Sequence, residues 1–598
     1  MEVNFKYNFR GYFRFYYSIL GNKIYLFLLL NVLVGLLDGI GLALIVPLFS
    51  SLFGAGNEGL LNTGKMHYIT DLLSGAGIPL TITNTVFVVV LVFSIKGLFR
   101  FLQMRYSSRI RFLFIRELRV QMLYLLNNLS YAGFLKLNAG KIQNALTTEI
   151  SGLYYTLTAY LSTLQCVGIL ITYFTLACMT NLQFAIMVLV FGATSNLLYR
   201  KLFSKTQKIS ANVSKESDTF ISYLIQSITH YRYLKATNYF KRYLGKLKKV
   251  IEEIELLNFR MGFFSALSEG IKEPVAIVMI SLILGLQFYL FPGSDKNAIL
   301  VCLLLFYRSL AQLGQLQTSW QFFAQNTGSI RSVTGLIREV QQSKEPAPKD
   351  LSPLSEVGEI RLSEVSVAYT GRAILEDINL HIPRHRTVAF IGESGSGKTT
   401  LAHVIIGLIT PTTGTVSIGS SPIGTISLDA YRDKIGYIAQ DPVVFSDTIF
   451  NNVTFFDDPT PENRQRFQKA VQQASLDGFI DTLPEKEHTQ VGDNGIYISG
   501  GQKQRLSIAR ELYKNVEVLV LDEATSALDS ATENIIQKSL ELLHGHCTII
   551  IIAHRLATIK MADTIFLIRN KTVAAQGSFD ALKESSEDFR QMIAAQRF

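Results

Sequence analysis

The sequence predicts a chain of two fold classes, an all-α membrane domain followed by a soluble α/β domain. Long apolar runs are confined to residues 1–340, and the remainder has the mixed composition of an ordinary soluble domain. At 598 residues the chain is also too long for a single hydrophobic core. A glycine-rich turn at Gly392–Thr400 lies between a strand-like run and a helix-like segment, which predicts a phosphate-binding α/β fold.

Six apolar runs in the first domain are long enough to cross a bilayer as helices, since one span needs about 20 residues. They lie near residues 24–49, 84–105, 156–179, 182–200, 262–290 and 297–320. Residues 5–20, which precede them, are amphipathic and aromatic, and we expect them to lie in the membrane interface. The sequence thus predicts transmembrane helices with long cytoplasmic extensions.

Basic residues predict how these helices are oriented. Arg100–Arg119 and Lys201–Arg260 lie in long stretches that are basic and helical in character. By contrast, residues 51–83 and 291–296 are nearly free of Lys and Arg. The positive-inside rule therefore places both termini and the two long basic connections in the cytoplasm.

Each long connection contains an expected turn, one at residues 131–140 and the other at residues 218–227. Helices that continue from the spans would carry these turns tens of ångströms (~1.5 Å per residue) into the cytoplasm, where they are well placed to touch the soluble domain. The alternative is a solvated, charged tip that touches nothing. Aromatic residues such as Phe134 and Phe220 are unusual at a fully hydrated tip, and they favour the contact.

Ionisable residues inside the apolar runs need either a partner or a function. Glu269 and Lys272 are three residues apart on a predicted helix, so we expect them to neutralise each other. Internal pairing is one interpretation of the whole set, and a basic, substrate-facing patch is the other. The set comprises Asp38, Lys96 and Arg308 near the bilayer midplane, with Glu269, Lys272 and Glu273 closer to the cytoplasm. The candidate substrate residues are Asp38, Lys96, Lys272 and Arg308.

The formal net charge of +10 is compatible with two kinds of partner, nucleic acid and an anionic membrane surface. The basic residues crowd beside the apolar runs instead of gathering on the soluble domain. We therefore expect an integral membrane protein that contacts lipid and binds no nucleic acid.

A stretch rich in proline, serine and charge separates the two domains. The expected bounds are residues 1–340 for the membrane domain, 341–358 for the linker and 359–598 for the soluble domain. Within the soluble domain, a strand-like segment leads to Tyr369, an aromatic residue placed to stack on a base. Gln440 follows another strand-like run, Ile435–Ile438.

The turn at Gly392–Thr400 has the chemistry of a phosphate-binding loop. Its glycines let the backbone wrap with N–H groups pointing inward, and a helix that begins near Lys398 adds the positive end of its dipole. Such a loop binds a nucleotide, with Lys398 on the β- and γ-phosphates and the Thr399 hydroxyl on Mg²⁺.

Two further motifs extend this site. Ser499–Arg505 reads SGGQKQR and precedes a helical pattern, whose amino end is suited to bind an anion. The buried strand Val518–Asp522 ends in a carboxylate that we expect to hold Mg²⁺, and Glu523 is placed to polarise an attacking water. His554 closes another apolar strand and is interpreted as a γ-phosphate contact.

Together these motifs resemble the nucleotide-binding domain of ABC transporters. The order of the whole chain resembles an ABC exporter half-transporter, with the membrane domain fused N-terminally to a P-loop ATPase domain. The most specific element is the SGGQ sequence, placed between the phosphate loop and Asp522. One departure is the segment Thr489–Gly495, TQVGDNG, which lacks a Glu and a Lys that the family usually has there.

The resemblance implies roles for individual residues. Glu523 and His554 would be catalytic, ATP and Mg²⁺ would be the ligands, and the two cytoplasmic turns would be coupling helices. Thr399, Gln440 and Asp522 would lie at the metal. The implied nucleotide contacts are Tyr369, Gly392, Glu393, Ser394, Gly395, Ser396, Gly397, Lys398, Thr399, Thr400, Gln440, Ser499, Gly500, Gly501, Gln502 and Asp529.

The resemblance also implies an obligate dimer, since the signature motif of one subunit completes the ATP site of the other, and a homodimer is the simpler expectation. The expected function is ATP-driven export or flipping of an amphipathic substrate across a bacterial inner membrane. A weaker resemblance to lipid-linked oligosaccharide flippases favours a phosphate-bearing lipid. The alternatives are a multidrug or peptide exporter, and an ATPase that acts as a channel or a regulator.

Overall fold

The computed structural model describes residues 6–52, 82–180, 182–290, 296–345, 354, 356–369, 371–523, 537–538, 540–541, 543–553 and 556–595. Its internal contacts divide the chain into two compact units. The first unit comprises Met1–Leu129 with Gly133–Lys344, and the second comprises Ser130–Ala132 with Glu345–Phe598. The main division between the units falls between Lys344 and Glu345. The last helix of the first unit runs to Gln342, and the first strand of the second begins at Ile360.

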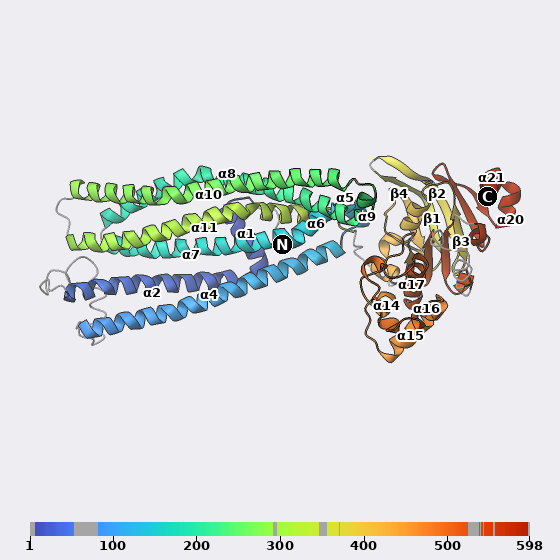
Figure 1. The fold of residues 1–598 in the computed structure, drawn as a ribbon, viewed down its shortest axis with the longest axis horizontal. Coiled ribbons are helices and arrows are strands. Elements are labelled where there is room, and N and C mark those ends of the chain that lie inside the picture. Colours follow the sequence, from blue (N-terminus) through green and yellow to red (C-terminus); the bar gives the residue numbers. More distant parts are fainter. Residues whose placement is uncertain are drawn as a thin grey trace. The chain divides into compact units, whose positions relative to one another are not determined.

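Among the described residues the first unit has six long helices, one at each of the predicted apolar runs, and they lie side by side in Figure 1. Among the described residues, three segments are long and apolar enough to cross a membrane: Lys23–Gly41, Thr83–Asn127 and Ala139–Met179. Helix α2 packs on α4, α7 packs on α11, and α8 packs on both α10 and α11. The long helices are α2 (Lys23–Leu52), α4 (Ile82–Asn127), α7 (Ile150–Thr180), α8 (Leu182–Thr229), α10 (Phe240–Leu290) and α11 (Lys296–Gln342).

A short amphipathic helix, α1 (Phe9–Leu20), precedes them. Its amino end is capped by Asn8, whose Oδ1 accepts a hydrogen bond of 2.8 Å from the Gly11 amide. Tyr12, Phe15 and Tyr16 are buried within the bundle, where their rings meet aromatic residues of α4, α7 and α11. The apolar face of this segment is therefore used for packing within the first unit.

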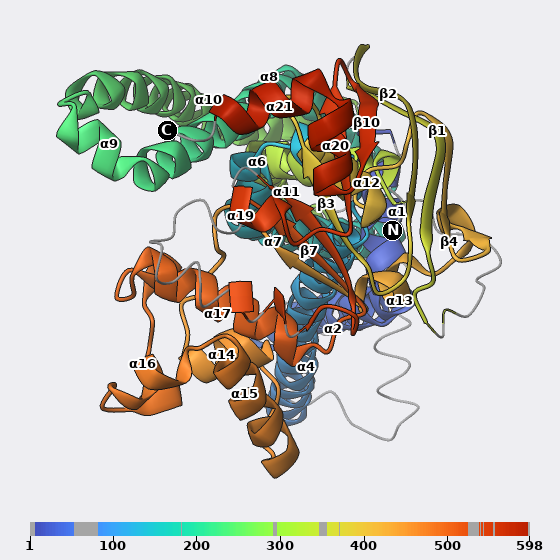
Figure 2. The ribbon, with the colours of Figure 1, turned by 90° about the vertical axis from the view of Figure 1, so that its right-hand side faces the viewer.

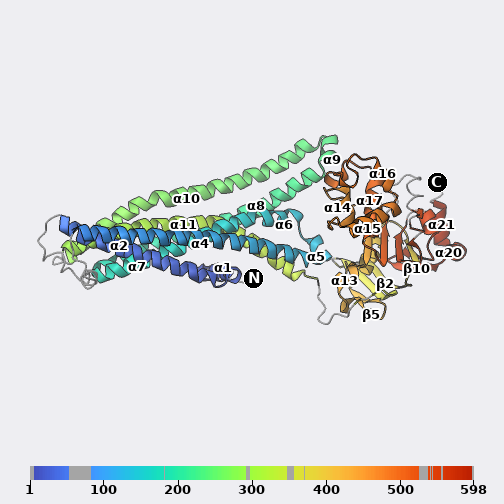
Figure 3. The ribbon, with the colours of Figure 1, turned by 90° about the horizontal axis from the view of Figure 1, so that it is seen from below.

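One of the two turns that the sequence predicts between the long helices lies elsewhere in the structure. Helix α5 (Tyr131–Lys136) and helix α6 (Ala139–Asn144) occupy the first, and a single π-helical turn (Ala145–Glu149) joins α6 to α7. The predicted turn at Asp218–Ser227 is wrong, because α8 continues through it without a break. The chain turns later, at α9 (Tyr231–Ala236), which joins the ends of α8 and α10 (Figure 3).

Two polar residues within 218–227 have partners at the amino end of α6 or on α6. The Asn144 amide donates to Asp218 Oδ1 at 2.7 Å, and the Asn138 amide donates to Ser222 Oγ at 3.0 Å. Because these side chains are satisfied within the helix bundle, they do not end the helix. The chain reverses direction between α9 and α10, where Asn238 has a φ of 58°. This left-handed conformation is incompatible with the interior of an α-helix.

The second unit contains two sheets. The larger has the order β10-β9-β3-β8-β7-β6, parallel except for the β10–β9 pair. The smaller, β2-β1-β4-β5, is antiparallel, and Figure 2 shows β1, β2 and β4 lying together. The strands are β1 (Ile360–Tyr369), β2 (Arg372–Ile382), β3 (Thr387–Ile391), β4 (Thr413–Ile418), β5 (Ser421–Pro422), β6 (Ile435–Ile438), β7 (Val518–Asp522), β8 (Thr548–Ile552), β9 (Thr564–Arg569) and β10 (Thr572–Gly577).

The helices of the second unit surround the larger sheet. Strand β3 is buried along its whole length, as expected of a parallel strand that is covered on both faces. Val388 and Phe390 pack into one core and Ala389 and Ile391 into the other. The helices are α12 (Lys398–Ile405), α13 (Leu428–Arg432), α14 (Ile449–Thr454), α15 (Pro461–Gln473), α16 (Asp477–Asp481), α17 (Gly500–Tyr513), α19 (Leu556–Ile559), α20 (Phe579–Ser585) and α21 (Glu587–Ala595).

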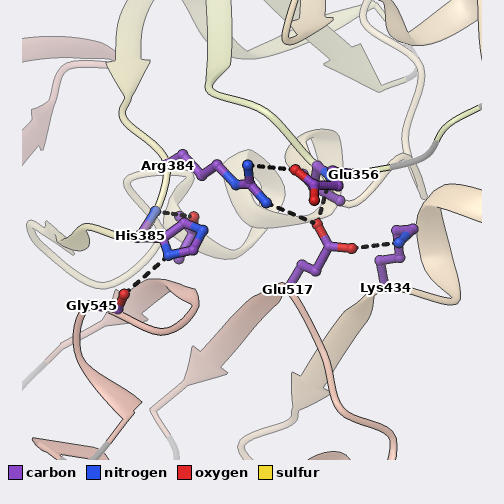
Figure 4. A network of polar contacts seen from close by, with 8 residues as sticks. Glu356, Arg384, His385, Lys434, Glu517 and Gly545 are labelled. Atoms are coloured by element: carbon purple, nitrogen blue, oxygen red, sulfur yellow. Dashed lines mark hydrogen bonds and ion pairs between the residues drawn. The ribbon is translucent and has the colours of Figure 1, made fainter.

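A charged network holds the amino ends of three parallel strands together (Figure 4). Glu517, just before β7, forms an ion pair with Lys434, just before β6. It also accepts a hydrogen bond of 2.7 Å from the Val357 amide and lies 3.9 Å from Arg384, which precedes β3. The carboxyl ends of the same strands lie at the opposite edge of the sheet, where the sequence predicts the phosphate-binding site.

Candidate functional site

The phosphate loop leaves β3 and enters α12, as the sequence predicts. Two of its glycines are required by the backbone. Gly392 (φ +152°) would place a Cβ atom 2.2 Å from the Ile568 carbonyl oxygen, and Gly397 (φ +103°) would place one 2.7 Å from Leu375. The Ser396 hydroxyl is buried and has no hydrogen-bond partner among the described residues. An unpaired buried hydroxyl in a loop of this kind fits a site that a phosphate group fills.

Lys398 is the first residue of α12 and is 5% exposed. Its ammonium group donates to the carbonyl oxygens of Gly392 and Glu393, at 2.9 and 2.8 Å. Burial lowers the pKa of Lys398, against the opposing charges of Glu523 and Asp522. A buried cation held by two carbonyls at a helix amino end is well suited to bind phosphate oxygens.

Thr399 and Asp522 come together from α12 and the end of β7. The Thr399 hydroxyl donates to Asp522 Oδ1 at 3.3 Å. Asp522 is 5% exposed, and this burial raises its pKa. Among the residues described, no cluster of three His, Cys, Asp or Glu side chains could hold a metal by itself. One hydroxyl and one carboxylate are nevertheless the hard oxygen donors that fit Mg²⁺ when phosphate oxygens and water complete its shell.

Gln440 and Glu523 also meet. The Gln440 amide donates to Glu523 Oε2 at 2.8 Å, and the Glu523 backbone N–H donates to the Ile552 carbonyl oxygen at 3.2 Å. Glu523 has a φ of 49°, in the left-handed region that non-glycine residues rarely adopt. The structure therefore brings Lys398, Thr399, Gln440, Asp522 and Glu523 to one edge of the sheet.

The SGGQ segment is the amino end of α17. Ser499 and Gln502 form a capping box, in which the Ser499 N–H donates to Gln502 Oε1 at 2.7 Å and the Gln502 N–H donates to Ser499 Oγ at 3.3 Å. Tyr369 ends β1, and burial raises the pKa of its hydroxyl. No described contact joins these segments to the phosphate loop. Asp529 and His554 lie outside the described residues.

Sequence reasoning missed two side chains beside Asp522. The Tyr437 hydroxyl, from β6, lies 3.2 Å from Asp522 Oδ2, and the Nε2 atom of His403, from α12, lies 3.3 Å from the Tyr437 hydroxyl. The sequence signals available were a polar residue, Tyr437, in an otherwise apolar strand and a histidine, His403, four residues after Thr399. Their proximity to Asp522 follows only from the strand order, which places β6 beside β7.

Of the six ionisable residues that the sequence analysis singled out in the apolar runs, four form two ion pairs. Lys96 forms an ion pair with Asp38, and the Tyr173 hydroxyl donates to the same carboxylate. Arg308, from α11, is exposed and within electrostatic range of Tyr173. Lys272 pairs with Glu269, as their spacing predicts.

A cavity of about 360 Å³ lies among α8, α10 and α11. The polar side chains of its lining are Tyr199, Glu269, Lys272, Glu273 and Gln317.

The fold and the site together define a P-loop ATP-binding domain joined to a domain of membrane helices. A family model described as "ABC transporter transmembrane region" matches residues 32–319, and one described as "ABC transporter" matches residues 375–526. The chain belongs to the ABC transporters and has the organisation of an exporter half-transporter, an integral membrane protein in which ATP hydrolysis is coupled to transport.

Similar proteins match most of this chain. The chain is 28% identical over 528 residues to the ATP-dependent lipid A-core flippase of Cupriavidus metallidurans, covering 86% of this chain and 84% of the relative. It is 27% identical over 603 residues to the ABC multidrug transporter MDR2 of Trichophyton interdigitale, covering 96% of this chain and 43% of the relative. A solved structure of a bacterial Atm1-family ABC exporter with ATP bound has the same fold, with a TM-score of 0.79 at 22% identity, covering 97% of this chain and all of that one.

Proposed function

We propose that two copies of this chain form a homodimer that uses Mg²⁺ and ATP to move a phosphate-bearing amphipathic lipid across a bacterial inner membrane. The observation that carries the ATPase part is the meeting of Lys398, Thr399, Asp522 and Glu523 at one edge of the sheet. In this proposal both termini are cytoplasmic, and the turns at α5 and α9 couple ATP binding to the membrane domain.

Each ATP-site residue has a proposed role. Lys398 and the loop amides bind the phosphates, and Thr399, with Asp522 directly or through water, holds Mg²⁺. Glu523 polarises the attacking water, and Gln440, which donates to Glu523, lies where it can sense the γ-phosphate and the metal. The signature segment that begins at Ser499 binds the nucleotide held by the other copy.

The headgroup proposal rests on charge within the membrane domain. Asp38, Lys96 and Arg308 comprise two bases and one acid. Because Lys96 and Asp38 neutralise each other, the net positive charge of the group resides on the exposed Arg308. An exposed guanidinium in a membrane domain is suited to a bidentate contact with phosphate. The lipid A-core flippases among the relatives agree with a lipid substrate.

A second candidate substrate is a cationic amphipathic drug. The cavity among α8, α10 and α11 contains Glu269 and Glu273 but only one base, Lys272. The Lys272–Glu269 ion pair leaves Glu273 as its uncompensated charge. A net negative, partly apolar cavity favours an amine-bearing ligand, and multidrug transporters are among the relatives.

Transport in proteoliposomes separates the two substrates. We expect Arg308→Ala to slow ATP-dependent flipping of a polyprenyl-diphosphate-linked oligosaccharide by about 10-fold or more, because a charged hydrogen bond is lost. Arg308→Lys, which keeps the charge but loses the bidentate geometry of the guanidinium, is the matched control and should have a rate between those of Arg308→Ala and the wild type. Lys96 is a poorer target, since its removal would leave Asp38 unpaired.

Unchanged flipping by Arg308→Ala would contradict the headgroup proposal. If flipping is absent in the wild type while a cationic amphipath is transported and Glu273→Gln abolishes that transport, the drug exporter is the correct assignment.

A further inference from the structure

Three polar side chains meet on one face of the parallel sheet, at the border of an apolar core, where Asp522 is buried and Tyr437 and His403 are half-buried. Tyr437 is paired in register with Val520, which lies on the same face of β7 as Asp522. The side chains of helix α12 that pack in this core are Leu401, Ala402, Val404 and Ile405. His403 is a polar residue within the same stretch of the helix. Polar groups in such a place are costly unless each has a partner.

The hydrogen bonds have a fixed direction. An ionised Asp522 has only acceptors, so the Tyr437 hydroxyl must donate its single proton to Asp522 Oδ2. The hydroxyl oxygen is then the acceptor for His403, whose Nε2 must carry a proton. The chain of donors therefore runs from His403 through Tyr437 to Asp522.

Each carboxylate oxygen of Asp522 therefore has an identified neighbour. Oδ2 accepts from Tyr437, and Oδ1 lies beside Thr399. Without Tyr437 the carboxylate would be free to rotate about its χ2 bond, and its second oxygen would be buried without this donor. Groups that hydrogen-bond a metal-binding carboxylate in this way fix its orientation, and their loss typically costs 10–100-fold in metal affinity.

We infer that Tyr437 and His403 are positioning residues for Asp522, and that they hold its Oδ1 toward the Mg²⁺ ion of Mg–ATP. This inference rests on the proposed role of Asp522 at the metal. Tyr437 acts directly on the carboxylate, while His403 acts through Tyr437 by fixing the direction in which the hydroxyl donates.

The test measures how much Mg²⁺ the full-length protein needs. Binding of trinitrophenyl-ATP is followed by fluorescence at increasing MgCl₂ and again in EDTA, and ATPase activity is measured over the same range. Tyr437→Phe should raise the Mg²⁺ concentration for half-maximal binding and turnover by about 10-fold or more, with little change of nucleotide binding in EDTA. His403→Gln should cause a smaller shift in the same direction. The double variant should match Tyr437→Phe alone, because His403 acts through the hydroxyl.

Tyr431→Phe is the matched control. Tyr431 is a buried tyrosine of the same core, and its hydroxyl donates to the Ile405 carbonyl oxygen at 3.0 Å, away from Asp522. Its removal should lower the melting temperature and leave the Mg²⁺ requirement unchanged.

Asp522→Asn tests the metal role of Asp522 separately from the positioning role of Tyr437 and His403. If it leaves the Mg²⁺ requirement unchanged, the metal role of Asp522 is wrong. If Asp522→Asn abolishes Mg²⁺-dependent binding while Tyr437→Phe behaves like Tyr431→Phe, the positioning role is wrong and the metal role stands. If His403→Gln shifts the Mg²⁺ requirement by the same factor in the wild type and in Tyr437→Phe, His403 does not act through Tyr437, and that part of the proposal is wrong.

Discussion

Glu523 occupies a backbone conformation that few residues adopt. Its φ of 49° places it in the left-handed region, at a cost of about 1–2 kcal/mol for a residue with a Cβ atom. The buried end of β7 and the Gln440 amide fix its position at the sheet edge. Strain of this kind persists where the surrounding structure determines the conformation, and it fits a carboxylate held for a chemical role.

We expect Glu523→Gln to bind Mg–ATP and to hydrolyse it at least about 100-fold more slowly, since a general base contributes roughly 10²–10⁴-fold. Single-turnover hydrolysis by the purified protein, together with ATP binding, measures both properties. Glu584→Gln, at an exposed position of α20, makes the same chemical change away from the site and should turn over normally. Turnover of Glu523→Gln at the wild-type rate would rule out Glu523 as the base.

The ATP-site motifs were predictable residue by residue because their chemistry depends on local sequence. The strand before the phosphate loop, the helix after it and the carboxylate that ends β7 are contiguous patterns, and the structure has each where it was expected. His403 and Tyr437 were not predictable. Their role depends on which strand lies beside β7, and no local pattern encodes that neighbour.

At the scale of elements, the amino ends of β3, β6 and β7 are joined through the carboxylate of Glu517. Burial by itself would raise the pKa of Glu517, but Lys434, the Val357 amide and Arg384 outweigh it and hold the pKa below its ordinary value. A carboxyl whose pKa is lowered by folding stabilises the protein above its unfolded pKa of about 4.3. That contribution is lost as the pH falls from there through the lower folded pKa.

Glu517→Gln should therefore destabilise the protein at neutral pH by about 1–2 kcal/mol, or about 2–6 °C in melting temperature. The difference from the wild type should shrink as the pH falls below about 4.3. Thermal unfolding of the detergent-solubilised protein across this pH range measures it. Glu376→Gln breaks an exposed ion pair with Lys571 and is the control, since exposed pairs contribute little. A melting temperature for Glu517→Gln equal to that of the control at pH 7 would show that the network does not stabilise the sheet.

The long helices of the first unit show where the prediction of elements from sequence fails. Each apolar run coincides with a long helix among the described residues, and three described segments are long and apolar enough to cross a membrane. The turn expected at residues 218–227 is absent, since Asp218 and Ser222 hydrogen-bond to Asn144 and Asn138 and α8 continues to Thr229. The position of a turn in a long amphipathic helix depends on tertiary hydrogen bonds, and the sequence alone does not reveal those.

At the scale of the whole molecule, the proposed function makes ATP hydrolysis depend on an assembly of two chains. Within one chain, Ser499 and its capping box are not joined by any described contact to the phosphate loop. In the proposed homodimer, the signature segment of each copy completes the site that contains Lys398 of the other. Symmetry then generates two equal sites per dimer.

Subunit complementation is the most direct measurement of this arrangement. Lys398→Ala removes the phosphate contact of a chain, and Ser499→Arg blocks its signature segment. Each variant alone should be inactive, since every site in its dimer has one damaged half. Co-expressed in equal amounts, they should recover about one quarter of wild-type ATPase activity, because half of the dimers are mixed and each of these has one intact site. If the mixture stays inactive while crosslinking shows that mixed dimers have formed, or if a purified monomer hydrolyses ATP at the full rate, the two-chain site is contradicted.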